Sequence, residues 1–75
     1  MAFLTDIKKN EEVIIEETLG HYKPLMSYGI FKGTILKVIR NDQWQEMVLV
    51  EFDGKRIAIR KEDARPIKVI RINGK

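Results

Sequence analysis

The chain has 75 residues, of which 44% are hydrophobic and 33% charged, with a formal net charge of +3 and no cysteine. This length allows one domain with a single small core, and the composition is that of a globular rather than a disordered chain. The lack of cysteine excludes disulfides, thiolate metal sites and cysteine nucleophiles, and it fits a reducing compartment. Residues 1–6 lack the basic start of a signal peptide, and no apolar run approaches the ~20 residues of a membrane span, so we expect a cytoplasmic protein.

The N-terminal part of the chain predicts a capped turn followed by a strand. Residues 4–10 resemble a turn in which Thr5 or Asp6 bonds to the next free backbone N–H groups, and Asn10 is suited to a left-handed conformation at its end. Residues 13–18 are rich in β-branched side chains, with apolar residues on both sides of the expected strand. This part therefore predicts one strand with one end buried.

A very short helix is predicted between Pro24 and Gly29. Proline suits the first turn of a helix, and glycine in a left-handed conformation closes one. Leu25 and Ile30 stand at the two positions that make an apolar contact across such a helix end. A second glycine turn then leads into a strand over residues 34–39, which are again rich in β-branched side chains.

The clearest local signal is a β-hairpin in the second half of the chain. A polar connection comes first, in which Asn41 and Asp42 supply turn chemistry. The alternating runs 47–52 and 55–60 flank Asp53-Gly54, and Asp-Gly between two such runs predicts a two-residue hairpin turn.

One helical turn over residues 61–64 and a final strand over 67–72 complete the predicted elements. Five short strands joined by tight turns predict a mainly β fold, a small barrel with one short helix or helical turns. The turn just before the last strand favours an SH3-like barrel over an OB fold. No repeat or linker divides the chain, so residues 1–75 are expected to form a single domain.

Three blocks of this sequence, spanning roughly residues 4 to 70, resemble the FeoA-like family. The blocks are the opening LTDIK of residues 4–8, the motif Leu25-x-x-x-Gly29-Ile30-x-x-Gly33 followed by Ile35 and Val38, and the closing IAIRKEDA of residues 57–64 followed by Ile67 and Val69. The resemblance implies an SH3-like accessory or regulatory protein of bacterial ferrous iron transport. Such a protein would interact with the membrane transporter FeoB in the cytoplasm, and the family is often associated with transition metal ion binding.

Catalysis is not predicted by the residues. His21 is the one histidine, and no nucleophile, base and orienting group form a recognisable set. The sequence has no GxxxxGK[ST] loop, so the chain is not itself a GTPase. For a metal, His21 and Glu17 are the candidates, and we expect either no cofactor or weak binding of Fe²⁺ or another divalent transition metal.

The segment before the second predicted strand holds more apolar side chains than a short turn can bury. Some would complete the core, and the remainder would form an exposed patch of the kind that marks a partner site. The alternative is that all of them complete the core. The predicted partner-binding residues are Leu25, Met26, Tyr28, Phe31, Lys32 and Trp44.

A basic set in the C-terminal third supports a second interpretation. These residues are Lys55, Arg56, Arg60, Lys61, Arg65, Lys68 and Arg71. On a small barrel they could bind RNA or DNA, or they could meet an acidic transporter surface or the anionic inner leaflet. The sequence leaves open whether the protein is a monomer or a weak dimer, and whether it activates or inhibits the transporter.

Overall fold

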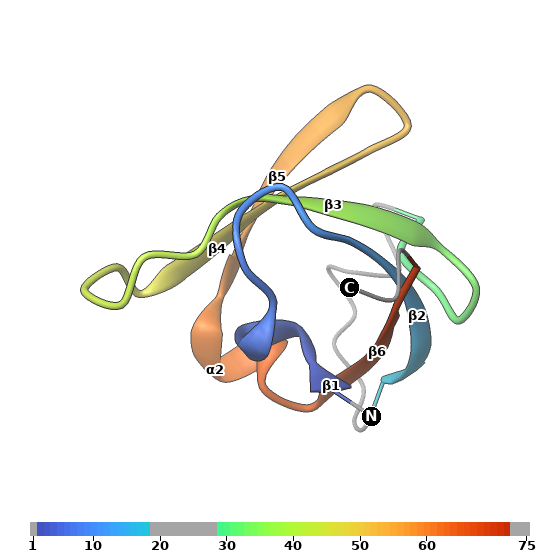
Figure 1. Cartoon of the computed structure of the whole chain (residues 1–75), viewed down its shortest axis with the longest axis horizontal. Coiled ribbons are helices and arrows are strands. Elements are labelled where there is room, and N and C mark those ends of the chain that lie inside the picture. The colour runs from blue at the N-terminus through green and yellow to red at the C-terminus, as the bar shows by residue number, and fades with distance from the viewer. Residues whose placement is uncertain (1, 19–28, 73–75) are drawn as a thin grey trace.

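The computed structural model describes residues 2–18 and 29–72, which form a six-stranded antiparallel sheet curled into a small barrel (Figure 1). The first half contributes β1 (Ala2–Phe3), the 3₁₀ turn η1 (Leu4–Asp6), β2 (Glu12–Thr18) and β3 (Ile35–Arg40). The second half contributes β4 (Met47–Phe52), β5 (Lys55–Arg60), the one-turn helix α2 (Lys61–Ala64) and β6 (Ile67–Arg71). The strand order is β1-β6-β2-β3-β4-β5.

This arrangement confirms the predicted SH3-like barrel, with one strand more than expected. The additional strand, β1, has two residues, Ala2 and Phe3, which pair with Val69 and Lys68 of β6. A pair of residues carries no periodicity, so this strand has no signature in the sequence. The predicted helix after Pro24 lies outside the described residues.

The predicted hairpin is present with the expected turn. Asp53 and Gly54 have φ values of 51° and 74°, so both are left-handed, as a type I′ turn requires. The pairing between β4 and β5 runs from Phe52 with Lys55 to Met47 with Arg60 without a bulge. The short turn thus fixes the register of the whole hairpin.

The core is formed mainly by alternate residues of the strands, whose side chains point inward. Inward-facing side chains of β2, β3, β4, β5 and β6 meet residues from the N-terminal turn and from α2. Fully buried residues include Leu4, Ile7, Val13, Ile15, Ile30, Leu36, Val38, Val48, Val50, Ile59, Ile67 and Val69. Each such side chain stabilises the fold by roughly 1.5–3 kcal/mol relative to its exposed state. Ile30 is buried as predicted, and Gly29 before it has φ of 87°.

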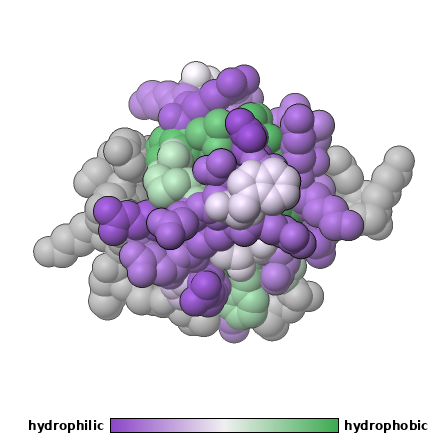
Figure 2. All heavy atoms as spheres, turned by 90° about the vertical axis from the view of Figure 1, so that its left-hand side faces the viewer, coloured by the Kyte–Doolittle hydropathy of each residue, from purple (hydrophilic) through white to green (hydrophobic). Residues whose placement is uncertain are grey.

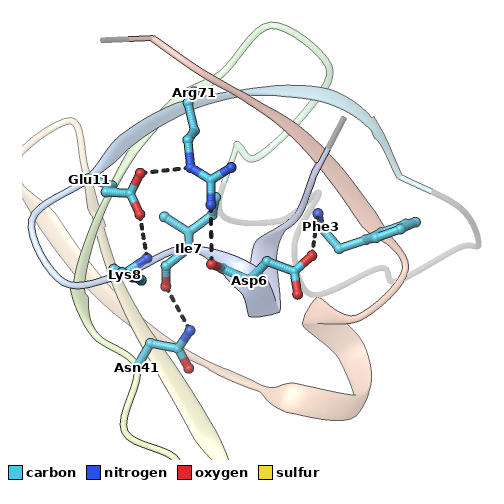
Figure 3. A network of polar contacts seen from close by, with 7 residues as sticks. All are labelled: Phe3, Asp6, Ile7, Lys8, Glu11, Asn41 and Arg71. Atoms are coloured by element: carbon cyan, nitrogen blue, oxygen red, sulfur yellow. Dashed lines mark hydrogen bonds and ion pairs between the residues drawn. The ribbon is translucent and has the colours of Figure 1, made fainter. Parts of the chain in front are cut away.

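A polar cluster ties the N-terminal turn to the last strand (Figure 3). The Glu11 carboxylate accepts hydrogen bonds from the Lys8 backbone N–H at 2.8 Å and from Arg71 Nε at 2.8 Å. Arg71 also donates to the Asp6 carbonyl oxygen at 3.4 Å. The Lys8 N–H first, and then the Arg71 guanidinium, lower the pKa of Glu11 from its ordinary value of 4.5. Asn10, within this connection, has the predicted left-handed conformation with φ of 71°.

The capping of η1 differs from the prediction. The Asp6 carboxylate accepts from the preceding N–H of Phe3, at 3.1 Å, and not from a following one. The helical turn begins at Leu4, so Asp6 is its third residue and reaches back, as the acidic member of a capping box does.

Asn41 joins the β3–β4 connection to the same N-terminal segment (Figure 3). Its Nδ2 donates to the Thr5 carbonyl oxygen at 3.0 Å and to the Ile7 carbonyl oxygen at 2.7 Å. These two bonds span 36 and 34 residues of sequence. Asn41 therefore fastens two distant segments, a role beyond the turn chemistry that its sequence context predicts.

Candidate functional site

The turn that leads into β3 is held by one side chain. Thr34 Oγ1 accepts the backbone N–H of Phe31 at 3.0 Å and donates to the carbonyl oxygen of Gly29 at 3.3 Å. The Thr34 backbone N–H donates to the Phe31 carbonyl oxygen at 3.0 Å. Three bonds to one threonine fix the backbone on both sides of Phe31.

Two backbone hydrogen bonds to β2 hold this turn against the barrel. The Gly33 N–H donates to the Ile15 carbonyl oxygen at 2.8 Å, and the Ile15 N–H donates to the Thr34 carbonyl oxygen at 2.9 Å. Ile30 is 1% exposed, whereas Phe31 next to it is 49% exposed and Lys32 is exposed. An aromatic side chain is thus presented to solvent on a backbone that needs little further ordering to bind a partner.

Three isoleucines form a row across the outer face of the sheet, beginning one residue after this turn. Ile35 of β3 pairs with Ile14 of β2, and Ile14 pairs with Ile70 of β6. Their chain neighbours Val13, Leu36 and Val69 point into the core, so the row points outward. Ile35 is 53% exposed, Ile70 is 49% exposed and Ile14 is half-buried. Phe31 and this isoleucine row together are called the apolar surface below.

Sequence reasoning missed the isoleucine row. Each of its members is recognisable as a strand residue, but only the register places them side by side, and β6 follows β2 by some fifty residues of chain. The outward position of Ile14 was the one available signal, because Val13 and Ile15 on either side are the stronger core candidates.

The predicted site residue Trp44 lies elsewhere on the molecule. It is 80% exposed in the loop between β3 and β4, at the end of β3 opposite to the Phe31 turn (Figure 1). This loop and α2 border a hollow of about 560 Å³, lined among others by Trp44, Met47, Arg60 and Arg65. The face on this side is largely hydrophilic, with small hydrophobic areas between the polar groups (Figure 2). Phe31 and Trp44 therefore do not belong to one continuous patch.

Several predicted site residues fall outside the described part of the chain, namely His21, Leu25, Met26 and Tyr28. Glu17, the second metal candidate, is exposed, and its carboxylate lies 3.9 Å from Lys68 Nζ. Within residues 2–18 and 29–72, no three His, Cys, Asp or Glu side chains come together as a metal site would require. Metal binding thus stays a prediction that involves His21.

The basic residues of the C-terminal third do not gather as an unopposed positive face. Four of them make ion pairs, Arg56 with Glu51, Arg60 with Glu62, Lys68 with Glu17 and Arg71 with Glu11. They are also divided between β5 and β6, which are separated by three strands in the sheet order. Binding to nucleic acid depends on unpaired cations along a phosphate backbone, so this arrangement gives it little support.

The fold and this surface define a class of protein, a small SH3-like barrel that presents apolar side chains on its exterior. The FeoA domain model matches residues 3–71, and the chain belongs to the FeoA family, which is linked to ferrous iron transport. In the described segments, no helix has the length and apolar character needed to cross a membrane.

Solved structures agree with the fold. The crystal structure of Iron Uptake Regulatory Protein (FeoA) is similar with a TM-score of 0.85 and 22% identity, over 95% of this chain and 97% of that one. FeoA from Chlorobium tepidum gives a TM-score of 0.87 and 22% identity, over 99% of this chain and 73% of that one. ScaR with bound Zn²⁺ gives 0.84 and 20%, over 96% of this chain and 37% of that one. No curated protein matches the chain in sequence.

Proposed function

We propose that this chain is an accessory protein of ferrous iron transport that binds the cytosolic part of a FeoB-type membrane transporter through its apolar surface. Membership of the FeoA family supports the link to transport. Two observations carry the binding surface: Phe31 is exposed on its fixed turn, and the isoleucine row begins at Ile35, four residues further along the chain. Apolar groups gathered on an exterior in this way are typical of partner sites.

The apolar groups of this surface should contribute more to the free energy of binding than its charged groups do. A phenylalanine side chain offers roughly 150–250 Å² of area, and about half of that is still exposed at Phe31. Burying about 100 Å² contributes up to about 2.5 kcal/mol at 25 cal/mol per Å². An exposed ion pair contributes about 0–1 kcal/mol. We therefore infer that Phe31 supplies affinity, and that Lys32 and other exposed cations supply orientation.

The experiment compares two single substitutions in a binding assay with the soluble cytosolic domain of the cognate FeoB. Phe31→Ala should weaken binding about tenfold or more, because truncation of a central aromatic residue at an interface commonly has that effect. Trp44→Ala is the matched control, since it removes a still more exposed aromatic side chain from the far end of β3. Equal affinities of the Phe31→Ala protein and the unchanged protein would remove this surface from the proposal.

Direct metal binding by this chain is a separate and weaker part of the proposal. We expect any affinity for Fe²⁺ or another divalent transition metal to be low and to depend on His21 and Glu17, since one imidazole with one carboxylate is half of a usual ligand set. A titration of the protein and its His21→Ala variant with Mn²⁺ or Fe²⁺ tests this. Unchanged affinity in the variant would exclude His21 as a ligand.

A further inference from the structure

Among residues 2–18 and 29–72, no strand pairs with the outer edge of β5. In this part of the chain β5 is the last strand in the sheet order, and its pairing partner is β4. A type I′ turn makes Phe52 and Lys55 a hydrogen-bonded pair, and such pairs alternate along an antiparallel ladder. The backbone N–H and C=O groups of Arg56 and Ala58 and the N–H of Arg60 therefore point away from β4, whereas the Arg60 carbonyl, at the N-cap of α2, accepts the first hydrogen bond of that helix.

This edge has the properties of a template for another strand. β5 is six residues long, and its pairing with β4 contains no bulge that would twist the edge away. Arg56, Ala58 and Arg60 are all exposed, and the small alanine side chain at the centre leaves the backbone accessible. Figure 1 shows the turn end of the hairpin of β4 and β5 extending beyond the rest of the barrel.

The geometry points to this edge as a strand-addition site for an extended, acidic segment of another protein, which would bind with its side chains alternating above and below the sheet. Main-chain hydrogen bonds would supply affinity, and the charges beside the edge would select the sequence. This site is distinct from the apolar surface and does not depend on the proposed binding to FeoB.

The charges on β5 favour an acidic occupant. The strand KRIAIR holds three cations and no acid. Arg56 and Arg60 each have one acidic partner, Glu51 and Glu62, and Lys55 adds a further cation beside a new strand. Cross-strand neighbours on one face are about 4.5–5.5 Å apart, close enough for carboxylates to meet Arg56 and Arg60. The existing ion pairs leave donors free, since Arg56 uses Nε toward Glu51 and Arg60 lies 3.6 Å from Glu62.

The same charges disfavour a second copy of this chain as the occupant. Antiparallel pairing of two β5 edges in the register that uses all three open residues sets Ala58 opposite Ala58. Arg56 of each copy would then lie opposite Arg60 of the other, and like charges in directly opposed positions are destabilising. Cations on an edge strand also guard against aggregation, and that role alone would leave the edge without affinity for any peptide.

A peptide titration followed by NMR distinguishes these possibilities. The probe is a short end-capped peptide in which glutamate and valine alternate, and the control peptide has lysine in place of each glutamate. We expect the acidic peptide to slow amide hydrogen exchange at Arg56, Ala58 and Arg60 and to shift these resonances saturably. The lysine peptide should do neither.

Two sets of protein variants complete the test. Arg56→Gln with Arg60→Gln should weaken binding of the acidic peptide about tenfold, as the loss of two exposed ion pairs implies. Lys37→Gln with Arg40→Gln removes the same charge from β3 and should leave binding unchanged. Ala58→Pro removes the central N–H of the edge and should abolish binding, with a melting curve to verify its fold.

Three results would overturn the inference. They are equal effects of the acidic and lysine peptides, peptide-induced shifts that avoid β5, and protection of the β5 amides that rises with protein concentration in the absence of peptide. The last of these would mean that a second copy occupies the edge.

Discussion

Replacement of Asn41 by alanine should cost this small domain a large part of its stability. The side chain donates two hydrogen bonds, at 3.0 Å to the Thr5 carbonyl oxygen and at 2.7 Å to that of Ile7. Each such bond contributes about 0.5–1.5 kcal/mol to the free energy of unfolding, so the expected loss is about 2 kcal/mol. With an unfolding entropy of about 2.1 cal/mol/K per residue, 75 residues give roughly 0.16 kcal/mol/K. The melting temperature should therefore fall by about 12 °C.

Thermal unfolding followed by circular dichroism measures this change, with two further variants to isolate its cause. Asn41→Asp keeps the size of the side chain but sets a negative oxygen against two carbonyl oxygens, so it should melt below the alanine variant. Gln43→Ala lies in the same loop at an exposed position and should melt within a few degrees of the unchanged protein. An alanine variant at Asn41 that melts no lower than the Gln43→Ala protein would refute the fastening role.

Two further predictions concern the polar cluster and the turn. The lowered pKa of Glu11 stabilises the fold at pH values above 4.5, and this contribution is lost as the pH falls through the lowered pKa. The stability of the Glu11→Gln protein should therefore fall less steeply with decreasing pH than that of the unchanged protein. Equal slopes in the two proteins would contradict the role given to Glu11. Thr34→Val should lower the free energy of unfolding in urea by about 1 kcal/mol and weaken FeoB binding, although Phe31 is retained. Thr34→Ser keeps the hydroxyl and should preserve both stability and binding. Identical behaviour of the two variants would show that the hydroxyl does not hold the turn.

The strands of this fold other than β1 could be predicted because their signals are local. Asp53-Gly54 defines a hairpin by the backbone angles that these two residues accept, and Gly29 and Asn10 mark left-handed positions for the same reason. The alternation of apolar and polar residues along β4 and β5 then indicates which side chains point into the core. These signals need no knowledge of what lies across the barrel.

The features that the sequence did not reveal depend on contacts between distant segments. Asn41 looked like a turn residue because its partners, Thr5 and Ile7, are more than thirty positions away. The isoleucine row needs the register of three strands, and the separation of Phe31 from Trp44 needs the direction of β3 between them. The ion pairs of the basic residues are hidden in the sequence for the same reason. Arg71, for example, bonds to Glu11, which is sixty positions away.

The central claim is that the apolar surface binds FeoB, and an amide chemical-shift titration with the soluble cytosolic domain of the cognate FeoB tests it most directly. The account predicts saturable shifts at residues 29–35 and at Ile14 and Ile70, with residues around Trp44 unaffected. Shifts confined to the loop that carries Trp44, or no shifts at high FeoB concentration, would contradict it.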